Sequence, residues 1–249
     1  MLTLSQNQLD RLGQVAFEEY LQRLVLHLRE RFPGHAGYLT QEQLLRVARH
    51  GCERAEQHGF ETERDLSLYT ELTVMLGAGF DSDPQLEWAG EVLRDASLED
   101  PRSRMDDLWE AALFYLDRVL GPKVVFPHLS YQVAREHRQA GKRTFTASDT
   151  GGLIACFRDI WPEKTRYVGT ATLGALIEGS RDAAARYGIR DDLGQAEFAI
   201  HAFLFGHQFH ADPLYPWTDD ILRNGTASGT ERASKLVSAF EAHLDPVLV

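Results

Sequence analysis

The chain has 249 residues, 43% of them hydrophobic and 25% charged, which is the composition of an ordinary globular protein. Its net charge of -11 is uneven, because residues 1–121 hold 12 Lys and Arg against 22 Asp and Glu, whereas residues 122–249 hold 14 against 15. Acidic surfaces repel phosphates, so we expect no nucleic-acid partner, and no apolar run approaches the roughly 18 residues of a membrane-spanning helix. The first residues carry no basic flank before an apolar run, so we expect no signal peptide and a cytoplasmic location.

The N-terminal part of the chain predicts two amphipathic helices. The first begins after Ser5 and ends at Pro33, and the second runs from Thr40, which forms a capping box with Gln43, to Gly59. Apolar residues of the first helix recur at the three- and four-residue spacing of one helix face: Leu9, Leu12, Ala16, Tyr20, Leu24 and Leu28.

A third predicted helix starts after Thr62 and leads into the stretch GAGFDSDPQLEW, residues 77–88. In this stretch Asp83 can cap a fourth helix that begins at Pro84, and we expect Trp88 to point back toward Phe80. A fifth helix spans residues 105–120. No segment alternates as a strand does, so the predicted fold class is all-α.

The same corner returns later in the chain as GHQFHADPLYPW, residues 206–217. Phe209, Asp212, Pro213 and Trp217 take the places of the first corner's residues. The offset in residue number that carries Gly77 onto Gly206 is here called the repeat offset. The repeat offset also aligns residues 23–33 with 152–162 and residues 53–65 with 182–194, without a gap. After a slip of one position, it aligns residues 105–117 of the fifth helix with residues 233–245 of the C-terminal helix.

Self-similarity at a fixed period indicates a repeated structural unit. We therefore predict a tandem duplication of a roughly five-helix unit, with a first repeat at 1–120, a linker at 121–130 and a second repeat at 131–249. Two such units can pack around a pseudo-two-fold axis, because isologous surfaces are self-complementary.

Residues shared by both corners suit structure better than catalysis, because no second titrating or nucleophilic group accompanies them in both copies. The histidines of the second repeat are the candidates for a metal site. Only His207 and His210, three residues apart, can share one side of a helix, and His201 aligns with the buried Leu72. We therefore expect no cofactor, and Asp212 already has a role as a cap.

Residues 58–93, HGFETERDLSLYTELTVMLGAGFDSDPQLEWAGEVL, resemble poorly characterised helical proteins associated with bacterial type VI secretion effector gene clusters. A His-Gly or Tyr-Gly, an acidic helix start and the Gly-x-x-Phe-x-x-Asp-Pro-x-x-x-Trp corner carry the resemblance. It covers most of the first repeat and extends more loosely to the second, where His201 and Pro216 depart from it. The resemblance implies an accessory role as a chaperone, an adaptor or an immunity protein, and transfers no catalytic residue.

These observations favour a non-enzymatic binding protein whose partner is another protein, such as a secreted toxin or its delivery component. The acidic first repeat suits a basic partner, and the predicted contact residues surround its helix junctions: Glu61, Glu63, Asp65, Asp81, Glu87 and Glu91. The alternative is a metal-dependent or small-molecule enzyme that uses the histidine-rich helix of the second repeat.

Overall fold

The computed structural model describes residues 6–98, 100–121, 131–136 and 148–244. These residues contain helices and no strand, so the predicted all-α fold class is confirmed for this part of the chain. Within it, no helix is both long and apolar enough to cross a lipid bilayer. The predicted cap Ser5 and nearly all of the predicted linker, 122–130, lie outside the described residues.

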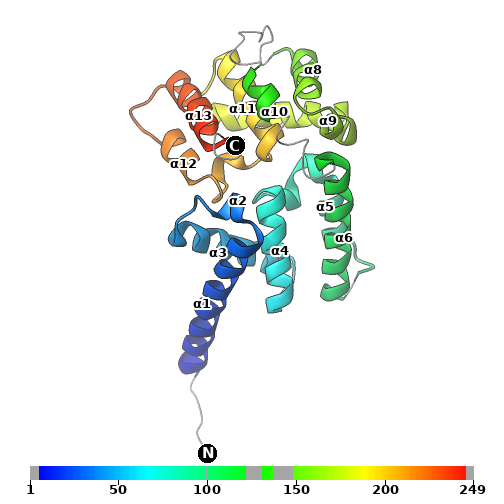
Figure 1. Cartoon of the computed structure of the whole chain (residues 1–249), viewed down its shortest axis with the longest axis vertical. Helices are drawn as coiled ribbons and strands as arrows, with labels where there is room; N and C mark the ends of the chain where they lie inside the picture. The colour runs from blue at the N-terminus through cyan, green and yellow to red at the C-terminus, as the bar shows by residue number, and fades with distance from the viewer. Residues whose placement is uncertain (1–5, 99, 122–130, 137–147, 245–249) are drawn as a thin grey trace, which may run out of the picture.

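The molecule is elongated, and the two halves of the chain occupy its two ends (Figure 1). Residues 6–121, here called the N-terminal half, form one end, with the start of α1 projecting from the body. This half contains short and long helices in the following order: α1 (Gln6–Arg31), α2 (Pro33–Ala36), α3 (Gln41–Gln57), α4 (Glu63–Leu76), η1 (Phe80–Ser82), η2 (Pro84–Leu86), α5 (Glu87–Arg94) and α6 (Pro101–Leu120).

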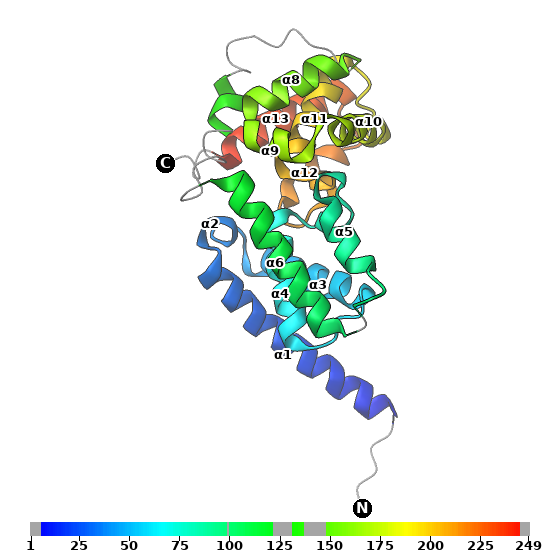
Figure 2. The same ribbon diagram turned by 90° about the vertical axis from the view of Figure 1, so that its right-hand side faces the viewer.

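Residues 131–244, the C-terminal half, form the other end. They begin with a helical stretch at 131–136 and continue with these elements: α8 (Thr150–Ile160), α9 (Pro162–Val168), α10 (Thr170–Arg186), α11 (Asp192–Phe205), η4 (Phe209–Ala211), α12 (Pro216–Leu222) and α13 (Gly229–Leu244). Figure 2 shows α6 running along the N-terminal half until it reaches α9. There the indole Nε1 of Trp161 donates to the carbonyl oxygen of Val119 at 2.9 Å.

Local sequence signals explain most helix ends. The predicted capping box at the start of α3 is confirmed, since Thr40 and Gln43 each bond the other's backbone N–H. Thr62 caps α4, and Asp191 caps α11 in the same way. The closing helix α6 starts four residues earlier than predicted, because Asp100 caps it and Pro101 suits its first position.

Several elements of the C-terminal half repeat the bounds of N-terminal elements at the repeat offset. Helices α3 and α10 correspond in this way at both ends, as do α4 with α11 and η1 with η4. Helix α13 starts one position earlier than the offset from α6 would place it, which is the slip seen in the sequence. Both halves share one hydrophobic core cluster, so the two ends of the molecule are packed together and not merely tethered.

Candidate functional site

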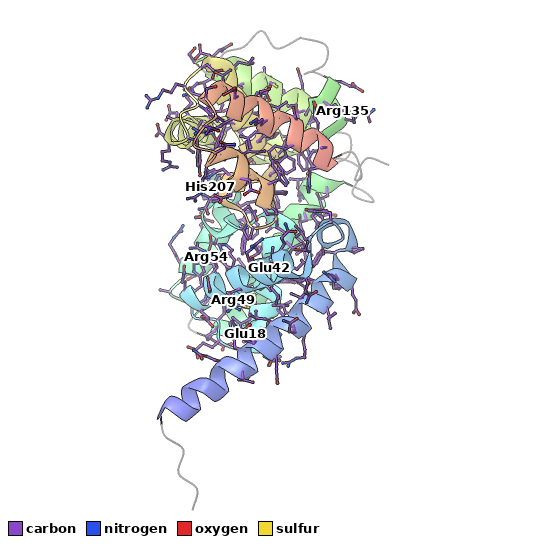
Figure 3. The ribbon with its side chains drawn as sticks, turned by 90° about the vertical axis from the view of Figure 1, so that its left-hand side faces the viewer. Glu18, Glu42, Arg49, Arg54, Arg135 and His207 are labelled. Carbon is purple, nitrogen blue, oxygen red and sulfur yellow. The ribbon has the colours of Figure 1, made fainter. Side chains whose placement is uncertain are left out.

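The two Asp-Pro corners meet at the junction between the halves. The carboxylate of Asp83 accepts one hydrogen bond from the Gln85 N–H, as an N-cap does, at 2.8 Å. Its other oxygen accepts from the backbone N–H of His207, in the opposite half, also at 2.8 Å. Figure 3 places His207 at this boundary. Asp83 thus caps its own corner and binds the other one.

Asp212 makes the reciprocal pair of bonds. It accepts from the Leu214 N–H within its own corner and from the Ala78 N–H of the N-terminal half, both at 2.8 Å. Both aspartates accept a backbone N–H as predicted, but Asp83 caps only the 3-10 turn η2, and Asp212 bonds within a turn and not at the start of a helix. The bonds across the junction were not predicted, because they join residues far apart in the chain.

Two glycines allow the corners to approach this closely. Gly77 and Gly206 have almost the same backbone angles, φ 96°, ψ 153° and φ 97°, ψ 153°, in the positive-φ region that suits glycine. A Cβ atom on Gly77 would lie 3.0 Å from the carbonyl oxygen of Phe205, and one on Gly206 would lie 3.3 Å from the Asp83 carboxylate. Glycine at these positions therefore keeps the junction tight.

The predicted aromatic clasp is wrong in detail. Pro84 starts the 3-10 turn η2, and α5 follows only at Glu87, so the ring of Trp88 lies against Tyr115 of α6, with centroids 5.9 Å apart. Phe80 instead contacts Tyr69.

The second corner differs from the prediction in the same way. Pro213 lies in a turn, and α12 begins only at Pro216. The ring of Trp217 contacts Phe240 of α13 at 4.5 Å, and Phe209 packs on Phe198 at 4.7 Å. In both halves the tryptophan therefore faces the closing helix.

A cavity of about 320 Å³ lies at the same junction. Much of its wall consists of pairs of positions related by the repeat offset, one from each half, such as His35 with Lys164. The other such pairs are Phe32 with Trp161, Met75 with Leu204, Leu76 with Phe205, Gly77 with Gly206, and Leu86 with Tyr215. Val74, Asp83, Gln85, Tyr131 and residues of α6 complete the wall.

An open groove of about 510 Å³ lies on the N-terminal half between α1, α4 and α6. Its floor includes Glu71, which is buried and whose Oε1 lies 2.7 Å from His27 Nε2. Glu71 Oε2 is buried without a hydrogen bond among the described residues, and the nearest cation, Arg31, is 3.8 Å away. Asp106 and Trp109 of α6 form the opposite wall.

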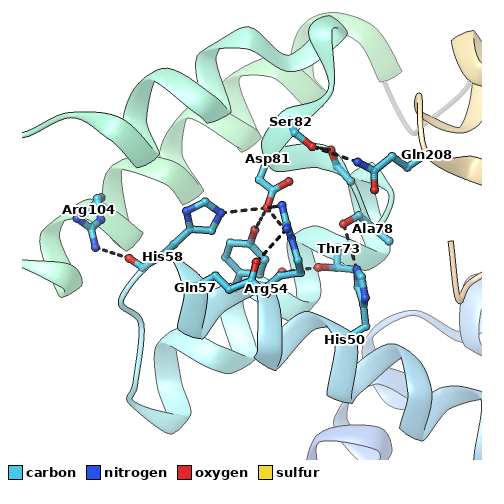
Figure 4. A network of polar contacts seen from close by, with 12 residues as sticks. His50, Arg54, Gln57, His58, Thr73, Ala78, Asp81, Ser82, Arg104 and Gln208 are labelled. Atoms are coloured by element: carbon cyan, nitrogen blue, oxygen red, sulfur yellow. Dashed lines mark hydrogen bonds and ion pairs between the residues drawn. The ribbon is translucent and has the colours of Figure 1, made fainter. Parts of the chain in front are cut away.

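A polar network inside the N-terminal half centres on Asp81 (Figure 4). This buried carboxylate accepts from the Tyr69 hydroxyl at 2.6 Å and from Arg54 at 2.5 Å, and lies 3.0 Å from His58 Nε2. Burial opposes its ionisation, but the hydrogen bonds from His58, Tyr69 and Arg54 outweigh burial and hold the pKa of Asp81 below its ordinary value.

Two of the six residues predicted to form an acidic contact surface are not available to a partner. Asp65 and Asp81 are buried and paired with arginines, Arg64 and Arg54, so they cannot present charge to a partner. The other four predicted residues are exposed, and Glu63 is paired with Arg23: Glu61, Glu63, Glu87 and Glu91. A role for these four in partner binding stays a prediction.

The histidines of the second corner make separate contacts. The Nδ1 atom of His210 is 3.1 Å from the Tyr187 hydroxyl, whereas that of His207 is 3.5 Å from the Asp83 carboxylate. His201 is buried and stacked on Phe240, as expected of a core histidine. No group of three or more His, Cys, Asp or Glu able to hold a metal ion is found within the described ranges.

No protein-family model matches this chain, and neither a curated protein nor a solved structure shows significant similarity to it.

Proposed function

We propose that the chain is a non-enzymatic protein-binding accessory protein, built from a tandemly duplicated helical unit. The coincident bounds of α3 with α10 and of α4 with α11 support the duplication. A matched interaction supports it too, since Arg104 donates to the carbonyl oxygen of His58 and Arg232 to that of Tyr187, both at 2.6 Å. The two acceptors are related by the repeat offset, and the two donors by the offset with the slip of one position.

The reciprocal bonds of Asp83 and Asp212 support a pseudo-two-fold relation between the halves. In an isologous interface, a residue i that contacts j implies that the counterpart of j contacts the counterpart of i. Asp83 binds the N–H of His207 and Asp212 binds that of Ala78, which is this pattern under the repeat offset.

The groove on the N-terminal half carries the binding proposal. Its polar lining is not repeated in the C-terminal half, because Cys156, Ala196 and Ile200 occupy the positions that correspond to His27, Ser67 and Glu71. A symmetric pair of units would repeat this lining or lack it in both halves. The polar lining is thus a feature of one half only, as expected if a partner without two-fold symmetry selects it.

The chemistry of the groove suits a basic side chain of another protein. Glu71 offers a buried carboxylate oxygen without a hydrogen bond, and Trp109 offers a ring to which a cation is attracted. Arg64, the groove's own arginine, is paired with Asp106 and Asp65. The formal charge of -10 on residues 1–121 would also draw a basic partner toward this half.

The resemblance to proteins of type VI secretion effector clusters supplies the proposed partner, a secreted effector or a component of its delivery. A chaperone, an adaptor and an immunity protein all need the same complementary surface. Deleting the gene separates them: loss of an immunity protein poisons the cell, whereas loss of a chaperone or adaptor stops secretion of the effector.

The test uses tagged full-length protein as bait in its native cell, with captured proteins quantified by mass spectrometry. We expect the wild type to capture one protein. The captured amount of that protein should fall at least tenfold with Glu71→Gln and with Trp109→Ala. The matched control is Val237→Ala, which alters the counterpart of Trp109 in the C-terminal half. Purified partner should then bind more weakly as salt is raised. Equal capture by all three variants, each shown to be folded by its melting temperature, contradicts the proposal.

A further inference from the structure

The cavity at the junction is separate from the groove and has no part in the proposed protein binding. Its walls are predominantly apolar, with Phe32, Leu116 and Leu120 only partly buried on the side of α2 and α6. A volume of about 320 Å³ lies at the lower end of the range of about 300 to 1,000 Å³ typical of small-molecule sites. An engineered apolar cavity of about 150 Å³ holds one benzene molecule, so this cavity has room for about a dozen non-hydrogen atoms.

One cation lies in this apolar setting. Lys164 is buried, and its ammonium donates to the carbonyl oxygen of Phe203 at 2.5 Å. It also lies 5.1 Å from the Trp161 ring centroid and 5.0 Å from that of Phe203. Among the described residues, one acceptor uses one of its three donors and no carboxylate comes within ion-pair distance, although Asp83 of the same wall favours its charge from farther away. A buried charge without a close counter-ion is costly, and an anion in the cavity would relieve that cost.

Three tyrosines add further donors. Tyr115, Tyr131 and Tyr215 line the cavity, and none of their hydroxyls has a hydrogen-bond partner in the part of the chain that the structure describes. Among the described residues of the wall, Asp83 is the only carboxylate, and it already accepts from the backbone N–H groups of Gln85 and His207. Apart from the amide oxygen of Gln85, the described groups with unused hydrogen-bonding capacity include the ammonium and the tyrosine hydroxyls, all of which can donate to an acceptor-rich ligand.

We propose that the cavity binds a small amphipathic carboxylic acid, with its carboxylate on the Lys164 ammonium and its apolar part between the two halves. The alternatives, a neutral apolar molecule and an amine, would each leave the lysine without a counter-ion. The tyrosine hydroxyls would hold the second carboxylate oxygen. Duplication would explain the asymmetry of the site, since the counterpart of Lys164 is His35, which is exposed.

The protonation of Lys164 fits this role. Burial lowers its pKa to about 8, an effect that Asp83 partly opposes, so the amine is still mainly protonated at neutral pH. The other titratable groups of the wall are the three tyrosines, whose pKa values burial raises, together with Asp83 and His35. None of the tyrosines ionises near neutrality, so affinity for a carboxylate should fall above about pH 8 because Lys164 loses its proton.

The experiment compares three ten-carbon probes, decanoate, decanol and decylamine, by calorimetric titration of the full-length protein below their micelle concentrations. We expect decanoate to bind with one molecule per chain, at least tenfold more tightly than decanol, and decylamine to bind most weakly. The preference for decanoate should shrink between pH 7 and pH 9.5, whereas the affinity for decanol should stay constant.

Lys164→Met keeps the length and apolar character of the side chain and removes its charge. It should lower decanoate affinity at least tenfold and leave decanol binding within about twofold, whereas the matched control Lys235→Met, on the exposed face of α13, should change neither. Should Lys164→Met fail to fold, the probe comparison and its pH dependence on the wild type decide the question. No binding of decanoate, equal affinity for decanoate and decanol, or tighter binding of decylamine would each overturn the proposal. None of these outcomes bears on partner capture by the groove, which Glu71→Gln and Trp109→Ala test separately.

Discussion

The two halves carry different polar and aromatic side chains at equivalent positions of a similar backbone. In the N-terminal half, the carboxylate of Asp81 gathers Arg54, His58 and Tyr69. The corresponding positions of the C-terminal half hold His210, Ala183, Tyr187 and Phe198, where one contact between Tyr187 and His210 at 3.1 Å and a cluster of rings replace the network.

The junction behaves in the opposite way. Asp83, Asp212, Gly77 and Gly206 keep both residue type and geometry. Side chains that satisfy backbone groups across the junction therefore cannot vary freely, whereas an interior polar network can be exchanged for aromatic packing.

The largest effect should come from cutting the junction itself. Asp83→Ala and Asp212→Ala each leave two backbone N–H groups without an acceptor, one in each half, and all of these bonds are buried except the part-buried one from His207. We expect each to lower the free energy of unfolding by about 3 kcal/mol. Urea unfolding measures this, with Asp95→Ala, in an exposed turn, as the control that should change stability far less. A cost at one aspartate several times that at the other would break the proposed equivalence.

The next largest effect should be a difference in stability cost between the Asp81 network and its aromatic counterpart in the C-terminal half. Asp81→Ala removes the acceptor shared by Arg54, His58 and Tyr69, and should cost about 2 to 3 kcal/mol, reduced from the value for a fully buried pair because Arg54 and His58 reach solvent. His210→Ala removes one hydrogen bond and ring contacts and should cost about 1 kcal/mol. Thermal or urea unfolding of both variants gives the ratio, and equal costs would mean that the network is no more stabilising than its aromatic replacement.

The sequence predicts the repeating parts well and the contacts between the repeats poorly. Helix ends follow from capping residues such as Thr40 and Thr62, and the Asp-Pro corners reveal their caps, because all these signals are local. Bonds such as that from Asp83 to His207 involve residues that only the folded chain brings together. Asp65 and Asp81 were expected on the surface because acidic residues are seldom buried, and partners that neutralise them are distant in sequence.

Lys164 was missed for a related reason: a lone lysine after a proline is typical of an exposed first helical turn. The repeat contained the signal that could have found it. The repeat offset aligns Lys164 with His35 and Trp161 with Phe32, and all four residues line the cavity. A lysine that replaces another residue type, close to a position that is aromatic in both halves, indicates a change at the shared surface.

The two junction aspartates have pKa values shifted in opposite directions, so their contributions to stability should depend on pH in opposite ways. Burial raises the pKa of Asp212 to about 7, although the N–H groups of Ala78 and Leu214 oppose this. Burial opposes ionisation of Asp83 as well, but His207 and the backbone donors outweigh it and lower its pKa. The residue facing Asp212 in the place of His207 is Ala78, which has no ring to offer.

Between about pH 4 and pH 7, folded Asp212 holds a proton that the unfolded chain releases, so its contribution to stability falls as pH rises, by at most about 1.4 kcal/mol per pH unit. The contribution of Asp83 is present above about pH 4 and is lost as pH falls below it. Urea unfolding of Asp212→Asn and wild type at several pH values should show that the variant lacks the falling component. His210 and His243, whose pKa values burial lowers to about 4, add a rising component to both proteins, and the difference between the two curves cancels it. Parallel curves for the two proteins would contradict the shift.

The smallest expected effect provides the strictest comparison, because it concerns one interaction present in both halves. Arg104 and Arg232 each donate to a backbone carbonyl at the end of the helix that precedes a positive-φ glycine, Gly59 or Gly188. Arg104→Met and Arg232→Met should each cost about 1 kcal/mol, because each leaves a carbonyl without that donor while the apolar stem remains. Arg232 also donates to the Asn224 carbonyl, so its cost should be the larger of the two.

These two changes lie in different halves and share no partner, so the double variant should show the sum of the single costs in urea unfolding. A double cost no larger than the greater single cost would mean that the halves unfold separately, and the shared hydrophobic core argues against that.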